Sequence, residues 1–218
     1  MAGGLEGGAL QEEVPMKLRF EYQKKNKNRI SVFSGDEYLF SISETTFIRE
    51  GFRNGMETAN PEALKKSCQK SEAYSYCLNI MGKKDYTKKE IFDKLLKREV
   101  DKEIASEIVN ELVENKYINE NYFEEIFIKS KQDYKKDGFN KIRQDLYRRG
   151  IEINSDSYDF EAENENLKLL VKELLAKNID DSKIIARLAR KGYRISDIIE
   201  KIRHYKEFEG EEEYYDEC

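Results

Sequence analysis

Residues 138–151 read GFNKIRQDLYRRGI, and this stretch decides the fold because its apolar pattern recurs twice elsewhere in the chain. The matching residues lie 51 positions earlier and 42 positions later, without gaps. The three aligned sets are Ile91, Leu95 and Val100; Ile142, Leu146 and Ile151; and Ile184, Leu188 and Tyr193. Self-similarity at fixed offsets is typical of stacked supersecondary units. We therefore predict a tandem array of helical repeats.

Each copy predicts a helix, because its first two apolar residues are four positions apart and lie on one helical face. Each helix ends in a basic pair: Lys97-Arg98, Arg148-Arg149 or Arg190-Lys191. Gly150 and Gly192 follow the second and third pairs and predict left-handed C-caps. Glu99 stands at the equivalent place in the first copy, so we expect that helix to lack such a cap.

Apolar stripes at helical spacing flank each copy and complete a three-helix bundle. In the first unit, Thr87 and Glu90 predict a capping box for the middle helix, and Asp101 predicts a cap for the third. Asn119 predicts the first cap of the second unit, and Asp181 predicts the middle cap of the third unit. The units are expected over residues 67–117, 118–163 and 164–206.

The third helix of the second unit remains an open question, because residues 152–166 carry six acidic residues and little apolar periodicity. Residues 16–66 form a β-rich extension, in which apolar and polar side chains alternate as in Leu18, Phe20 and Tyr22. The predicted fold class is therefore mainly α: three tandem three-helix repeats preceded by a small N-terminal antiparallel β meander.

The two ends differ from the body in charge. Residues 1–15 carry three acidic residues and no basic one, and we interpret them as a leader or an appended extension. Residues 207–218 carry seven acidic residues and no basic one, and we expect an acidic disordered tail. The whole chain has a net charge of -5, yet residues 16–206 hold 39 basic against 34 acidic residues. The positive body leaves a nucleoprotein partner open.

Composition excludes several classes of site. One histidine, His204, and three cysteines, Cys68, Cys77 and Cys218, supply neither a multi-histidine metal site nor an even disulfide framework. We therefore expect no enzyme activity, no cofactor and no metal. No apolar run reaches the ~18 residues that would span a membrane, so a cytoplasmic protein is expected.

Residues 117–131, which read YINENYFEEIFIKSK, together with 138–151 resemble the RecX family of bacterial regulators of the RecA recombinase. The copies at 87–100 and 182–193 resemble the other two repeats of that family. The resemblance implies a regulator that is not an enzyme and that acts in recombination, DNA repair and the SOS response. It also implies binding to the RecA filament on single-stranded DNA, with suppression of ATP hydrolysis, strand exchange and coprotease activity.

The resemblance further implies RecA as the partner, with single- or double-stranded DNA as an additional partner. We also expect a monomer with no membrane partner. Residues 128–151 hold eight basic and three acidic residues, which suits acidic protein or phosphate. The candidate contacts with filament or DNA are Lys97, Arg98, Lys141, Arg143, Arg148, Arg149, Arg187, Arg190 and Lys191.

Two alternatives stay open at this point. Basic residues in the last turn stabilise a helix without any partner, which would explain the basic pairs as ordinary helix ends. The chain could also be a helical nucleic-acid-binding module that acts without RecA. For the acidic tail, competition with phosphates for the basic residues and simple solubility are the two hypotheses.

Overall fold

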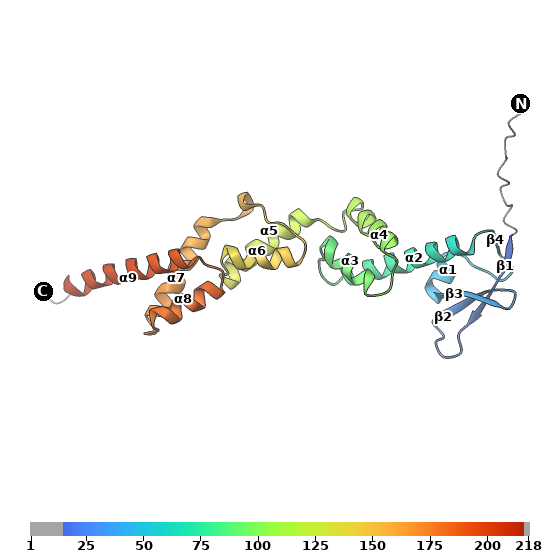
Figure 1. The fold of residues 1–218 in the computed structure, drawn as a ribbon, viewed down its shortest axis with the longest axis horizontal. Helices are drawn as coiled ribbons and strands as arrows, with labels where there is room; N and C mark the ends of the chain where they lie inside the picture. Colours follow the sequence, from blue (N-terminus) through green and yellow to red (C-terminus); the bar gives the residue numbers. More distant parts are fainter. Residues whose placement is uncertain (1–14, 216–218) are drawn as a thin grey trace, which may run out of the picture. The chain divides into compact units, whose positions relative to one another are not determined.

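The structure is a computed structural model that describes residues 15–215, with side-chain burial through Glu207. Two compact units form the chain (Figure 1). One consists of the described residues through Lys84 together with Phe92–Leu112, and the other of Asp85–Ile91 together with the described residues from Val113 onward. All but the last residue of the predicted leader, and residues 216–218 of the predicted tail, lie outside the described residues.

Four strands of the first unit form an antiparallel sheet in the order β3-β2-β1-β4. The strands are β1 (Met16–Tyr22), β2 (Arg29–Ser34), β3 (Glu37–Ser43) and β4 (Glu57–Thr58). Val32 of β2 pairs with Phe20 on one side and with Phe40 on the other, so side chains of three strands form one buried row. Helices α1 (Glu44–Arg49) and α2 (Pro61–Met81) pack on β3, which confirms a small sheet supported by a helix (Figure 1).

Two short elements were not predicted. Helix α1 begins at Ser43, whose Oγ accepts a hydrogen bond from the Thr46 N–H at 3.1 Å. Strand β4 has two residues, which pair with Met16 and Lys17 of β1. Neither element is long enough to show a hydrophobic period, so periodicity could not reveal it.

The helices that follow in the first predicted repeat are α2, α3 (Lys88–Leu96) and α4 (Lys102–Glu114). Helix α2 begins ahead of the predicted boundary at residue 67, because Asn60 caps it and Pro61 occupies its first turn. Cys68 and Cys77 on this helix are buried free thiols, and burial raises the pKa of each to about 11.

The remaining elements are α5 (Glu120–Ser130), the π-helical turn η1 (Lys131–Lys135), α6 (Phe139–Arg148), the 3-10 turn η2 (Ser155–Ser157), α7 (Phe160–Leu175), α8 (Asp181–Arg190) and α9 (Ile195–Tyr215). Between α6 and α7 the described chain has η2 in place of a third α-helix for the second repeat. Helix α7 starts ahead of the predicted boundary at residue 164, because the Asp159 carboxylate accepts a hydrogen bond from the Ala162 N–H at 2.8 Å.

The nine aligned apolar residues of the three copies are all buried, and none is more than 8% exposed. In each copy the first two lie on the middle helix, α3, α6 or α8. The third follows the helix end and donates its backbone N–H to the carbonyl five residues earlier, as Ile151 does to Leu146 at 3.0 Å. The predicted mainly α fold with tandem helical repeats is confirmed.

The predicted N-caps are mostly confirmed. Thr87 and Glu90 form the reciprocal capping box of α3, and Asp101 and Asn119 accept hydrogen bonds from the first turns of α4 and α5. The assignment of Asp181 as a cap was wrong, since it lies inside the first turn of α8, and its carboxylate binds Lys206 Nζ at 2.8 Å.

The C-cap prediction for α3 was also wrong. Glu99 has a φ of 61°, so it adopts the left-handed conformation without being glycine, as Gly150 and Gly192 do at the equivalent places. The Val100 N–H then reaches the Leu95 carbonyl at 3.1 Å, the bond that closes the helix end. The repeat therefore imposes this backbone shape even where the residue disfavours it.

The acidic segment differs from the disordered tail that its composition predicts, because helix α9 continues through Tyr215. Glutamate is a good helix former, and extending an existing helix avoids the cost of nucleation. None of the described helices is both long enough and apolar enough to pass through a bilayer.

Candidate functional site

The two residues of each basic pair in the second unit have different surroundings. The Arg148 side chain is 65% exposed, and its contact is with Asp145 one turn earlier, at 3.5 Å. Arg190 is likewise exposed, and its Nε donates to the Ala186 carbonyl of its own helix at 3.2 Å. The first residue of each pair therefore presents its charge to solvent.

Arg149, the second residue of its pair, is half-buried and held by other side chains. Its guanidinium lies 3.1 Å from the Glu90 carboxylate and 5.5 and 5.2 Å from the ring centroids of Phe123 and Phe127. Its backbone carbonyl accepts a hydrogen bond from Thr87 Oγ1 at 2.6 Å. Arg149 thus joins the end of α6 to the first turn of α3.

Lys191 connects the end of α8 to the start of α6 in the same way. We call each of these two connections between middle helices a joint. Its backbone carbonyl accepts a hydrogen bond from the Gly138 N–H at 2.8 Å. Its Nζ lies 3.6 Å from the Asp137 carboxylate and donates to the carbonyls of Lys135 and Lys136. In both joints, the residue directly before one middle helix donates a hydrogen bond to a backbone carbonyl in the next copy. That carbonyl belongs to the second residue of the basic pair.

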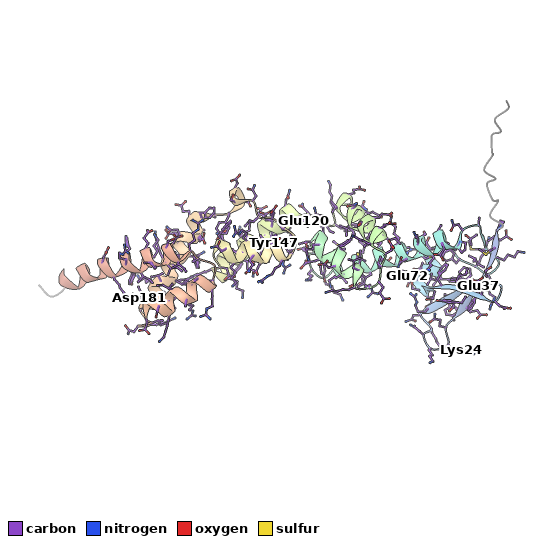
Figure 2. The ribbon with its side chains drawn as sticks, viewed as in Figure 1. Lys24, Glu37, Glu72, Glu120, Tyr147 and Asp181 are labelled. Atoms are coloured by element: carbon purple, nitrogen blue, oxygen red, sulfur yellow. The ribbon has the colours of Figure 1, made fainter. Side chains whose placement is uncertain are left out.

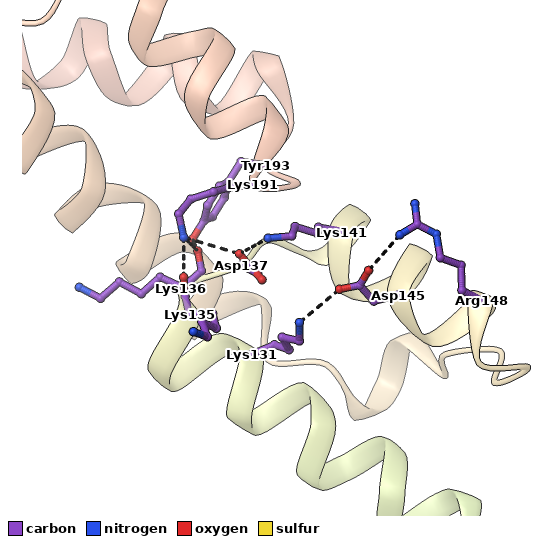
Figure 3. A network of polar contacts seen from close by, with 9 residues as sticks. All are labelled: Lys131, Lys135, Lys136, Asp137, Lys141, Asp145, Arg148, Lys191 and Tyr193. Carbon is purple, nitrogen blue, oxygen red and sulfur yellow. Dashed lines mark hydrogen bonds and ion pairs between the residues drawn. The ribbon is translucent and has the colours of Figure 1, made fainter. Parts of the chain in front are cut away.

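Asp137 is the centre of the second joint (Figure 3). Its side chain is 4% exposed and lies 2.8 Å from Lys141 Nζ, with Lys191 on the other side. A buried carboxylate needs such partners because ionised groups are costly to desolvate alone. Figure 3 shows Lys141 and Lys191 pointing toward this carboxylate. The single carboxylate therefore engages both of these predicted contact residues and offsets one of their two positive charges.

Glycine is required at this joint by close approach of the backbones. Gly192 has a φ of +96°, and a Cβ atom there would lie 2.5 Å from the Lys141 backbone nitrogen. At Gly138 a Cβ would meet the Gly192 carbonyl carbon at 2.7 Å. Neither position tolerates a side chain without moving the chain.

The remaining predicted contacts are exposed. Arg143 on α6 and Arg187 on α8 face solvent, with the Arg143 guanidinium 5.7 Å from the Phe139 ring centroid. In the first unit, Lys97 is exposed and the Arg98 guanidinium lies 4.1 Å from the Tyr76 ring centroid. We define the outward arginines as the exposed arginines predicted on α6 and α8, namely Arg143, Arg148, Arg187 and Arg190.

The carboxylate partners of the basic residues were missed in the sequence. Glu90 lies 59 positions before Arg149, so local spacing could not connect the two. Asp137 could have been found from its position directly before Gly138, at the start of a middle helix. A groove along α6 was also missed, although three residues that line it, Asn140, Gln144 and Tyr147, follow a helical spacing in the sequence.

No catalytic constellation accompanies these charges in the described part of the chain. No group of three or more His, Cys, Asp or Glu side chains there is placed to hold a metal ion. Burial raises the pKa of Glu163, whose Oε1 accepts a hydrogen bond from the Phe139 N–H at 2.8 Å and so supports the start of α6. What the arrangement offers is a set of exposed arginines on helices whose ends are joined.

Comparison with known proteins identifies two domains in order along the chain. Residues 19–58 match the domain described as "Regulatory protein RecX N-terminal domain", and residues 73–112 match "RecX, first three-helix domain". A crystal structure described as regulatory protein RecX shares the fold, with a TM-score of 0.58 and 22% identity over 88% of this chain and 100% of that one. The crystal structure of RecX from Lactobacillus salivarius covers 62% of this chain and 96% of that one, with a TM-score of 0.56 and 24% identity.

Sequence relatives give the same result. The regulatory protein RecX of Oceanobacillus iheyensis is 29% identical over 80% of this chain and 71% of its own length. That of Clostridium beijerinckii is 33% identical over 67% of this chain and 70% of its own length. With this degree of identity and both domains in place, the chain belongs to the RecX family.

Proposed function

We propose that this protein binds the filament that RecA forms on single-stranded DNA and inhibits its ATP hydrolysis, strand exchange and coprotease activity. The observation that carries the proposal is membership of the RecX family, whose relatives bear the name of a regulatory protein. The protein acts in recombination and DNA repair as a monomer, by binding and without chemistry of its own.

The charge distribution supports this proposal. The outward arginines give the second unit exposed positive charge, whereas Lys141 and Lys191 share the buried Asp137 carboxylate. A planar guanidinium can bind carboxylates and phosphates in a bidentate manner, and a nucleoprotein filament presents both. We therefore assign the filament contact to these arginines, with Lys97 and Arg98 as further contacts in the first unit.

A RecA ATPase assay on single-stranded DNA tests the proposal. The protein is titrated into preformed filaments, and the rate of ATP hydrolysis is followed. We expect the rate to fall as the protein approaches a stoichiometric ratio to RecA. An unchanged rate at that ratio, together with no change in strand exchange or coprotease activity, would overturn the proposal.

The alternative function is a helical nucleic-acid-binding module that acts without RecA. The observation in its favour is the excess of eight basic over three acidic residues in 128–151. It predicts tight DNA binding by the protein alone with a steep salt dependence, and no effect on RecA ATPase. The ATPase assay with and without a large excess of unrelated competitor DNA separates the two functions.

A further inference from the structure

A groove of about 740 Å³ runs along the outer side of α6 in the second unit. Its lining consists of Asn140, Arg143, Gln144, Tyr147, Ile151, Glu152 and Ile153. Tyr147, labelled in Figure 2, is 71% exposed although it belongs to a helix with a well-buried apolar face. An aromatic ring left in solvent beside a groove is available to a ligand.

The spacing of the lining residues explains how one helix forms a wall of this groove. Positions 140, 143, 144 and 147 follow the i, i+3, i+4, i+7 rule and so lie on one face of α6. The chain after the helix supplies Ile151, which is 5% exposed, and Ile153, which is half-buried. The groove therefore combines apolar surface with exposed amides, a guanidinium and a phenol ring.

The other two copies lack this combination. The equivalent stripe is Lys89, Phe92, Asp93 and Leu96 on α3, and Ser182, Ile185, Ala186 and Ala189 on α8. On α8, Ile185 and Ala189 pack against the core of their own repeat. The repeat fold thus does not require amides, an arginine and a tyrosine at these positions, and α6 is distinguished from its copies by them.

The lining matches the chemistry of an unpaired nucleotide. A tyrosine ring and neighbouring isoleucines provide a stacking surface, and Asn140 and Gln144 can hydrogen-bond to base edges. Arg143 supplies the charge for a phosphate, while Glu152 can accept a hydrogen bond from an exocyclic amine. Bases within a duplex are stacked and cannot enter such a groove, which favours single strands.

We propose that the groove along α6 binds unstacked bases of single-stranded DNA, with Tyr147 as the stacking residue and Arg143 on the adjacent phosphate. The inference deepens the proposed function, because the filament on which the protein acts contains single-stranded DNA. It assigns a direct DNA contact to a defined surface that includes Arg143, whereas Arg148, Arg187 and Arg190 do not line the groove and remain assigned to the filament contact.

The experiment measures binding of the full-length protein to a fluorescein-labelled single-stranded oligothymidylate without RecA, as a function of salt. Tyr147→Ala should weaken binding about tenfold and leave the slope against salt unchanged, because it removes stacking and no charge. Tyr147→Phe should retain wild-type affinity. Arg143→Gln should lower the slope by about one, as expected for one lost phosphate contact.

Tyr134→Ala is the matched control, since Tyr134 is 85% exposed on η1 in the same basic stretch but does not line the groove. It should bind like the wild type, and circular dichroism should show that all variants are folded. The proposal is overturned if the wild type does not bind the oligonucleotide at low salt, or if Tyr147→Ala binds as tightly as the wild type. Equal losses for Tyr134→Ala and Tyr147→Ala would also overturn it.

The same proteins in the RecA ATPase assay keep the two proposals apart. Inhibition of RecA by a wild type that fails to bind free oligonucleotide contradicts the groove and leaves the proposed function intact. Tyrosine-dependent DNA binding without any inhibition of RecA supports the groove and contradicts the proposed function.

Discussion

At the scale of single residues, Arg148 and Arg149 show how adjacent basic side chains acquire different roles. Successive residues of an α-helix point roughly 100° apart, so one can face a neighbouring helix while the other faces solvent. Arg149 meets Glu90, and Arg148 stays exposed. Arg190 and Lys191 repeat this division one copy later. In the second and third copies, the basic pair therefore supplies one surface charge and one joint.

Reversing the charge of the two exposed residues should impair RecA inhibition without unfolding the protein. For Arg148→Glu combined with Arg190→Glu, we expect the concentration that half-inhibits RecA ATPase to rise about tenfold, which corresponds to ~1.4 kcal/mol of lost binding. The loss follows because the reversed charges repel acidic groups of the filament. The measurement is the ATPase titration described above.

The matched control for this variant is Lys65→Glu combined with Lys66→Glu, which makes the same charge change at exposed positions on α2. This control should inhibit RecA as the wild type does. If both double variants lose inhibition equally, net charge is responsible and the outward arginines have no special role.

The buried Asp137 gives a prediction about stability at the scale of single residues. Asp137→Ala removes the buried carboxylate that Lys141 and Lys191 share, and we expect the free energy of unfolding to fall by ~2 kcal/mol. The loss stays below the cost of a fully buried pair because both lysines can turn to solvent. Urea denaturation measures it, with the exposed Asp133→Ala as a control that should change stability by less than ~0.5 kcal/mol. Equal midpoints for the two variants would contradict the assigned role.

At the scale of elements, the ends of the middle helices follow one geometry in all three copies. Glu99, Gly150 and Gly192 all have positive φ angles, and the next residue closes the helix end in each case. Periodicity predicted the three helices, because their buried residues repeat at fixed offsets. It did not predict the left-handed Glu99, because this conformation is imposed by the surrounding chain and not by the residue.

Glu99 and Gly150 occupy equivalent positions after their helices, and we predict that substituting them changes the free energy of unfolding in opposite directions. Glu99→Gly should raise the free energy of unfolding by ~0.5 to 1 kcal/mol, since glycine adopts this φ without the steric cost of a Cβ. Gly150→Ala should lower it, because the new Cβ would lie 2.7 Å from the Lys89 Cβ. Thermal unfolding of both variants checks the pair, and a destabilised Glu99→Gly would show that the glutamate side chain is needed there.

Other elements were beyond prediction for physical reasons that differ. Strand β4 depends on pairing with β1, about 40 residues away, and α1 is shorter than two turns. The acidic segment after Lys206 was misjudged because its charge favours disorder, while its glutamates favour extension of the helix already formed. The groove residues on α6 follow a helical spacing that the sequence contains. They resemble an ordinary polar helix face until the equivalent residues of the three copies are compared.

At the scale of the whole molecule, the net charge of -5 conceals a positive body, because residues 16–206 hold 39 basic and 34 acidic residues. The fixed offsets predicted the tandem array, and the family resemblance led to the proposed partner. The division of the chain into two compact units was not predictable, because it passes through α3. The first turn of α3 belongs to the second unit through hydrogen bonds and ion pairs that join residues some 60 positions apart.

The most direct test of the central claim is equilibrium binding of the fluorescently labelled protein to preformed RecA filaments on single-stranded DNA. Measured by anisotropy, the wild type should bind and saturate, and Arg148→Glu with Arg190→Glu should bind about tenfold more weakly while Lys65→Glu with Lys66→Glu binds normally. An anisotropy that stays at the value of the free protein up to stoichiometric RecA would contradict the account.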